Sequence, residues 1–355
     1  MPNSKPSAEL DNLTATVQRN CHVSDALYAG NYTMCVFLLK MREYYRWEQG
    51  IALTGELDRE SVGDWLVERE RTWDRIENED FEPLPAHDGD SINAFDTNAV
   101  NGQLLSKKYV YSSGKGLYNK PHFFIGDLEK RDTIGDITIL ISGREYARDL
   151  VAPPSMYRDK IVFVRKESLR RYLWERIEEW RFHKGKDQHP IGRSLDSYGS
   201  RRDLERVLDE MTDNETGSLI LHEVGEARAG ELLGPKWEEM LATFPRTKFE
   251  FQARAVRDLL ADSLVTLPAL LEQKNDPSLH VYFANLGGMR KHLAPGLGAA
   301  YQQWNETGNY APIYESARQG QEYWLLKALS VLEDYCNRGS DARGDMETML
   351  EQAAI

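Results

Sequence analysis

Most hydrophobic positions of the chain recur every three or four residues, which is the period of an amphipathic helix. Residues 31–49 show this pattern clearly, because one helical stripe collects the apolar side chains Met34, Leu38, Met41 and Tyr45 and continues to Ala52 just beyond the segment. The same period predicts further helices at residues 58–78, 168–184, 204–211, 218–233, 249–273 and 311–337. Residues 1–20 lack such a stripe, and we expect them to form a loose N-terminal arm.

Between residues 107 and 166 the pattern changes to short segments rich in β-branched and aromatic residues. Gly and Pro separate these segments, which is typical of strands joined by turns. The predicted strands are residues 107–113, 122–132, 136–142 and 159–166. The pattern therefore predicts an α+β protein that is predominantly α-helical, with a small, mainly antiparallel sheet in the middle of the chain.

The 355 residues suffice for one large domain or two ordinary ones. After the N-terminal arm we expect a segment at 21–150, in which helices are followed by the β region, and a mainly helical domain at 151–355. No long linker marks the division near residue 150, so the two parts could also pack as one unit. Residues 80–96 are rich in Pro, Gly, Asp and Asn and are expected to form a loop.

Charge and composition limit the classes of partner that we expect. The formal net charge is −13, and a surface of that charge repels phosphate, so we expect no nucleic-acid partner. No segment approaches the roughly 20 apolar residues that span a bilayer, and no signal-peptide core is present, so we expect a cytoplasmic protein without a membrane partner. A small-molecule substrate or a protein partner remains open.

The candidate chemistry centres on the segment His222-Glu223-Val224-Gly225-Glu226. His222 and Glu226 are four residues apart, so on a helix they project from the same side, where they could share a divalent metal. Glu223 lies on a neighbouring face and could act as a catalytic base. Gly225 and Gly230 lower helix propensity, which indicates close approach of another backbone or a ligand.

This segment departs from the zinc-peptidase signature His-Glu-x-x-His, because Glu226 stands where the second histidine would be. The departure makes a peptidase the least favoured of the functional interpretations. A purely structural role, a packed helix with a hydrogen-bonded histidine, would explain the same residues.

Other pairs repeat the four-residue spacing. Glu179 and His183 are predicted to lie on one helix, at the edge of its apolar stripe, while Asp258 and Asp262 lie on another. Together with His222 and Glu226 they could supply the ligands of a carboxylate-bridged dinuclear iron or manganese site. Iron, manganese and zinc are the possible metals for a site of histidine and carboxylates. The usual Glu-x-x-His pair of such sites is missing, and similar pairs also occur on solvated helices.

Cys21 and His22 precede the first predicted helix, and a thiol beside an imidazole could support nucleophilic catalysis. Neighbours in sequence usually point in different directions, so we favour an ordered turn in which Ser24 or Asp25 caps a helix. The serine-hydrolase elbow, the dinucleotide-binding fingerprint and the full phosphate-binding loop are all absent from the sequence.

Two segments carry a resemblance to a known family. Residues 21–50, CHVSDALYAGNYTMCVFLLKMREYYRWEQG, and residues 221–234, LHEVGEARAGELLG, resemble an uncharacterised family of bacterial soluble proteins, a domain of unknown function. The resemblance implies a bacterial cytoplasmic origin, and it indicates nothing about an activity or catalytic residues.

Three functions are compatible with these patterns. The first is a metal-dependent enzyme, such as an oxidase, with a carboxylate and histidine site in a helical core. The second is a non-enzymatic protein-binding or assembly factor. The third is a metal-independent enzyme whose site lies between the sheet and the helices, with residues 80–96 as a lid.

Overall fold

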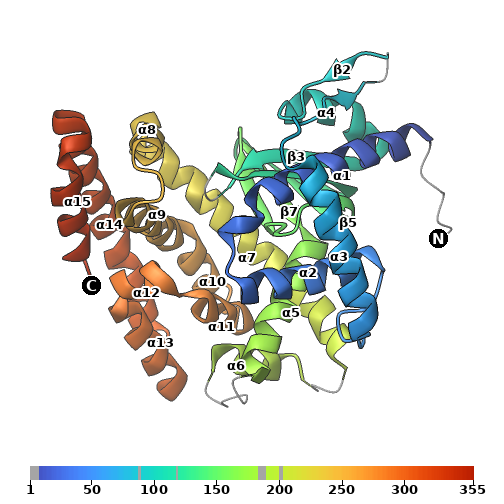
Figure 1. Ribbon diagram of the computed structural model, residues 1–355. Helices are drawn as coiled ribbons and strands as arrows, with labels where there is room; N and C mark the ends of the chain where they lie inside the picture. Colours follow the sequence, from blue (N-terminus) through green and yellow to red (C-terminus); the bar gives the residue numbers. More distant parts are fainter. Residues whose placement is uncertain (1–7, 87–88, 117–118, 183–188, 200–202) are drawn as a thin grey trace. The chain divides into compact units, whose positions relative to one another are not determined.

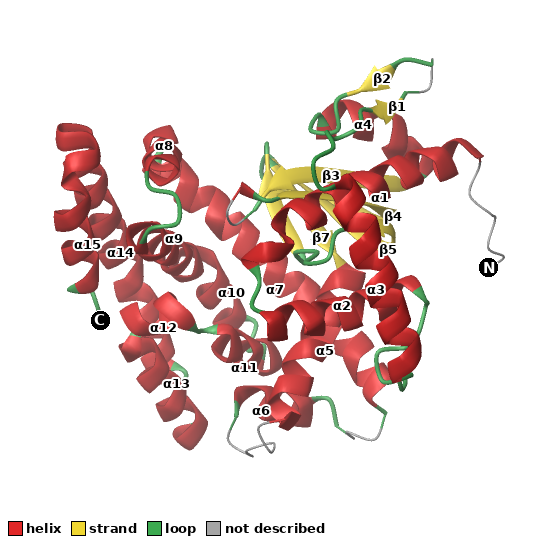
Figure 2. Cartoon of the chain, in the orientation of Figure 1, coloured by secondary structure: helices red, strands yellow, loops and turns green. Residues whose placement is uncertain are grey.

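The computed structural model describes residues 8–86, 89–116, 119–182, 189–199 and 203–355. The chain divides into two compact units, residues 1–174 and 175–355 (Figure 1), which are called the first and the second unit below. Helices predominate, and the strands of the described residues all belong to the first unit (Figure 2). The predicted fold class, predominantly helical α+β, is confirmed.

The first unit is built around a five-stranded sheet with the strand order β3-β4-β5-β7-β6. Its strands are β3 (Tyr109–Lys115), β4 (Pro121–Ile134), β5 (Ile137–Arg148), β6 (Ser155–Arg158) and β7 (Ile161–Arg165). Neighbouring strands are antiparallel except β5 and β7, which are parallel. The mainly antiparallel sheet is therefore confirmed. Within this sheet the prediction missed β6, whose four half-buried residues are too few to show a period.

Helix α1 (Ala8–Tyr28) packs against β4 and β5. Its buried stripe, Leu10, Leu13, Val17 and Cys21, joins a core cluster with Tyr111, Phe123, Ile125 and Ala147. The expected loose arm at residues 1–20 is therefore wrong from Ala8 onward. The apolar residues do recur at helical spacing there, but polar residues surround them so densely that the stripe is inconspicuous.

Two further helices, α2 (Met34–Glu48) and α3 (Arg59–Ile76), confirm the predicted ones and share a core that contains Met41, Tyr44 and Trp73. The predicted buried stripe of α2 is only partly correct. Met34 is 71% exposed and Leu38 is 44% exposed. The remaining elements of this unit are α4 (Thr97–Leu104) and a small hairpin, β1 (Leu84–Pro85) with β2 (Ser91–Ile92), within the predicted loop.

Helix α5 (Lys166–Phe182) begins in the first unit and ends in the second. The second unit continues with α6 (Pro190–Ser197), α7 (Leu204–Leu233), α8 (Pro235–Thr243), α9 (Lys248–Ala261), α10 (Leu267–Glu272), α11 (Asp276–Asn285), α12 (Gly288–Leu293), α13 (Pro295–Thr307), α14 (Ala311–Arg338) and α15 (Arg343–Glu351). Helix α9 is central, because it packs against α7, α12, α14 and α15. No helix among the described residues is long and apolar enough to cross a membrane.

A π-helical turn, Asp262–Thr266, joins α9 to α10. Pro268 lies in the first turn of α10 and cannot donate a backbone hydrogen bond to the preceding turn. A wider π turn accommodates such a break without ending the helix, and π turns of this kind often occur at functional sites. The turn begins at Asp262, one of the carboxylates that the sequence singles out.

Candidate functional site

The candidate site lies where α7 and α9 approach each other closely. A Cβ atom added at Gly225 of α7 would lie 2.6 Å from the backbone oxygen of Ala261 in α9. Only glycine allows this approach, so one of the two predicted close contacts is confirmed. At Gly230 an added Cβ would meet no atom within 4 Å, so no other backbone approaches this glycine closely.

His222 of α7 is held by a buried carboxylate of the π turn. Its Nδ1 lies 2.8 Å from Oδ1 of Asp262. The second oxygen of Asp262 accepts hydrogen bonds from the Tyr282 hydroxyl and from Arg290 Nη1, each at 3.1 Å. These contacts fix the orientation of the imidazole ring, because the carboxylate itself is held at both oxygens.

The other side of the imidazole ring faces Glu226. Their closest atoms, His222 Nε2 and Glu226 Oε1, are 3.6 Å apart, which is longer than a hydrogen bond. Arg257 approaches Glu226 at 3.4 Å and donates a shorter bond of 2.9 Å to Glu238. The side chains of His222 and Glu226 are 25% and 22% exposed, so solvent reaches this side of the ring.

Electrostatics of the site favour positive charge on the ring. Burial alone would lower the pKa of His222, but the nearby carboxylates of Asp262, Glu226 and Glu223 raise it to about 10. Burial and the charge of Glu226 raise the pKa of Asp258 to about 6. Among the described residues none donates a hydrogen bond to the Asp258 carboxyl group.

The structure thus brings together two of the predicted pairs. His222, Glu226, Asp258 and Asp262 lie at the contact of α7 and α9, and we call these four residues the α7–α9 cluster. Glu223 is buried on the same helix, near enough to His222 to raise its pKa. Within the described part of the chain, no three or more His, Cys, Asp or Glu side chains already form a group that could hold a metal ion.

The remaining predicted pair does not join the cluster. The side chain of Glu179 is 54% exposed and forms an ion pair with Arg176 at 2.5 Å, so Glu179 does not lie in a helical core. His183 lies outside the described residues. A four-residue spacing on a helix does not distinguish a solvated pair from a buried one.

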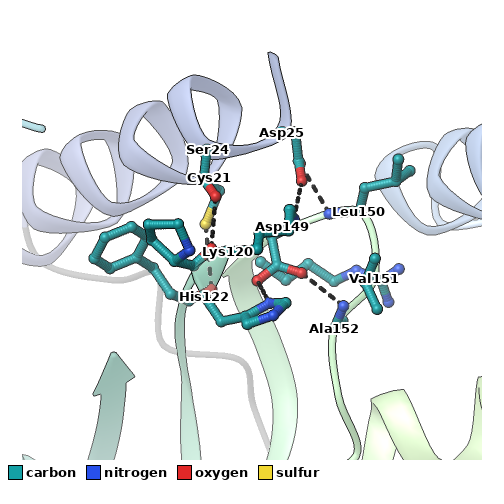
Figure 3. A network of polar contacts seen from close by, with 12 residues as sticks. Cys21, Ser24, Asp25, Lys120, His122, Asp149, Leu150, Val151 and Ala152 are labelled. Atoms are coloured by element: carbon teal, nitrogen blue, oxygen red, sulfur yellow. Dashed lines mark hydrogen bonds and ion pairs between the residues drawn. The ribbon is translucent and has the colours of Figure 1, made fainter. Parts of the chain in front are cut away.

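A second polar network, which the sequence did not reveal, is buried in the first unit (Figure 3). Lys120 donates a 2.7 Å hydrogen bond to Asp25, whose other oxygen accepts one from the Leu150 backbone. His122 lies 2.8 Å from Asp149, which also accepts from the Ala152 backbone. The network ties α1, β4 and the segment after β5 together.

This network corrects the expectation for the residues near Cys21. Helix α1 continues through Asp25, so neither Asp25 nor Ser24 caps a helix. Burial raises the pKa of Cys21, whose thiol contacts the Phe123 carbonyl oxygen at 3.2 Å. His22 instead contacts Arg69 at 2.6 Å. A protonated, enclosed thiol that points away from its neighbouring imidazole does not form a nucleophilic pair.

Fold and site together define a mostly helical α+β protein of two units, with a histidine and carboxylate cluster in the helical second unit. The family models for the N-terminal and C-terminal domains of the Family of unknown function (DUF6866) match residues 12–165 and 170–353. The chain therefore belongs to this family, which confirms the resemblance to an uncharacterised domain family. No curated protein matches the chain, and no solved structure does.

Proposed function

We propose that the protein is a metal-dependent enzyme whose metal ion would be bound by the α7–α9 cluster. One observation carries the proposal: His222 Nε2 faces Glu226 Oε1 at 3.6 Å, while Asp262 holds the opposite ring nitrogen. Two ligands of one tetrahedral metal ion, each about 2.1 Å from it, lie about 3.4 Å apart. A carboxylate on the distal nitrogen is also the common partner of a metal-bound histidine.

Charge supports a cation at this position. Four carboxylates, those of Glu223, Glu226, Asp258 and Asp262, lie around the ring of His222, and the guanidinium groups of Arg257 and Arg290 offset only part of that charge. The raised pKa of His222 means that a proton occupies the ring at neutral pH. A metal ion would displace this proton from Nε2 and take over its role in balancing the carboxylates.

Asp258 is the best candidate for a third ligand. Its carboxyl group is near Glu226 and receives no hydrogen bond from any described residue, so a metal ion would not have to compete for it. One imidazole and two carboxylates suit iron(II), manganese(II) or zinc. Such a donor set leaves coordination positions for water and substrate, where a bound metal supplies Lewis-acid chemistry.

The test is metal binding as a function of pH. Titration calorimetry of the metal-free protein with Mn²⁺ and Zn²⁺ should give one site per chain. Between pH 6.5 and 8.5 the affinity should rise about tenfold per pH unit, because binding displaces one proton from a group with a pKa of about 10. His222→Ala should abolish binding.

The matched control is His292→Ala in α12, because the side chain of His292 is 52% exposed and pairs with Glu351. This variant should bind metal as the wild type does. Three results would each overturn the proposal: no stoichiometric binding, equal loss in the two histidine variants, or an affinity that does not change with pH.

A further inference from the structure

A pocket of about 360 Å³ in the first unit is lined by three arginines and two aliphatic residues. Arg42 and Arg46 come from α2, Arg59 and Val62 come from the first turn of α3, and Leu57 precedes α3. Guanidinium groups are concentrated here although the whole chain carries a net charge of −13. The pocket is independent of the α7–α9 cluster, which belongs to the second unit.

The deepest of these arginines is fixed in position. The side chain of Arg46 is 6% exposed, and its Nη1 donates to the backbone oxygens of Ala52 and Gly55 at 2.6 and 2.7 Å. Its Nε lies 3.3 Å from Glu43. Among the described residues nothing accepts a hydrogen bond from its Nη2, so one face of a rigid guanidinium group remains available to a ligand.

The three arginines of the pocket differ in their acidic neighbours. Glu43 is the carboxylate shared by Arg42 and Arg46. Arg59 is exposed, and no described residue forms an ion pair or a hydrogen bond with it. The nearby Asp58 carboxylate caps α3, because its Oδ2 accepts from the Ser61 backbone and hydroxyl at 2.8 and 2.7 Å. Among the described residues, Arg59 therefore has no acidic partner, and the nearby Asp58 carboxylate is committed to the helix cap.

Arg59 has no evident structural reason to be a cation. It occupies the first position of an 18-residue helix, where the positive end of the helix dipole disfavours a positive side chain. An anion bound in the pocket would reverse this effect, since it would interact favourably with both the guanidinium groups and the helix end.

We propose that this pocket binds a small phosphomonoester. A phosphate monoester carries a charge of about −1.5 to −2 at pH 7, which suits paired guanidinium groups better than a single carboxylate does. The phosphate would lie between Arg59 and Arg46, and the organic part would contact Leu57 and Val62. The arginines form a single pocket and not an extended basic groove, so the pocket does not suit the repeated phosphates of a nucleic-acid backbone.

The test uses phenyl phosphate as the probe, with inorganic phosphate and benzoate as comparators, in titration calorimetry of the full chain. Phenyl phosphate should bind one site per chain, more tightly than either comparator. Arg59→Gln should weaken binding at least tenfold, because it removes the one guanidinium group of the pocket without an acidic partner.

The matched control is Arg71→Gln, which makes the same charge change on α3 at a side chain that is 71% exposed and outside the pocket. It should leave the affinity within twofold of the wild type. A second variant, Leu57→Asp, keeps all three arginines and should also weaken binding at least tenfold. Absence of saturable binding, equal losses in the two arginine variants, or benzoate binding as tightly as phenyl phosphate would each overturn the proposal.

Discussion

Gly225→Ala and Gly230→Ala should change the stability of the protein in opposite directions, although both lie in α7. At Gly225 a methyl group would lie 2.6 Å from the Ala261 backbone oxygen and 3.1 Å from its carbonyl carbon. These are backbone atoms, so the contact can be relieved only if α7 and α9 move apart. At the exposed Gly230 the methyl group would meet nothing within 4 Å.

The magnitudes follow from two opposing effects. Replacing Gly by Ala in a helix interior gains about 1 kcal/mol, and this gain applies at both positions. Overpacking a well-packed contact costs roughly 1–3 kcal/mol, and more where backbone must shift. Gly225→Ala should therefore lower the free energy of unfolding by about 1–2 kcal/mol, and Gly230→Ala should raise it by about 0.5–1 kcal/mol.

Urea unfolding followed by tryptophan fluorescence measures both changes, because Trp237 and Trp324 belong to the core that α7 and α9 share. A second measurement is the pKa of His222 by NMR. In Gly225→Ala the separation of the two helices should lengthen the contact between His222 and Asp262 and lower this pKa from about 10. If Gly225→Ala is as stable as Gly230→Ala, the close approach of α7 and α9 is wrong.

Two further predictions concern buried charges. Burial raises the pKa of Glu215 to about 7 in the folded protein, whereas the ordinary value is 4.5. Between these pH values the unfolded chain ionises at this side chain while the folded protein keeps it protonated, so the free energy of unfolding falls by roughly 3 kcal/mol as pH rises. Glu215→Gln should remove this loss, and denaturation at pH 5 and pH 8 checks it; an unchanged pH dependence would contradict the assignment. Lys120→Met should cost about 3–5 kcal/mol, because it leaves the buried Asp25 carboxyl group without its cationic partner. In urea unfolding the double variant with Asp25→Asn should recover part of that loss, and no recovery would mean that the pair does not set the cost.

Helix α7 illustrates how tertiary contacts extend what the sequence predicts locally. The pattern predicted two helices, at 204–211 and 218–233, because residues 212–217, TDNETG, have low helix propensity. The structure has one continuous helix through this stretch. Glu215 is buried there and accepts a 2.6 Å hydrogen bond from Ser278 of α11. Burial against another helix overrides local propensity, and no window of the sequence contains that information.

The candidate site was predictable in its parts but not in its assembly. The four-residue spacing identified His222 with Glu226, and Asp258 with Asp262, as pairs on single helices. The same spacing identified Glu179 and His183, and Glu179 is solvent-exposed. What joins the first two pairs is the approach of α7 to α9 at Gly225 and the π turn at Asp262, both of which are properties of packing.

The buried network of the first unit depends on strand register, which explains why strand prediction alone could not reveal it. At the hairpin, Ile134 pairs with Ile137, and an uninterrupted ladder from there would pair Phe124 with Ala147. The irregularities between Ile125 and Lys130 shift the register by one residue, so Phe124 pairs with Arg148 instead. A one-residue shift exchanges the two faces of a strand. The position of Asp149 beside His122 therefore follows from irregularities in the β4–β5 pairing whose net extra residue lies in β5, and a pattern of apolar and polar residues does not specify their place.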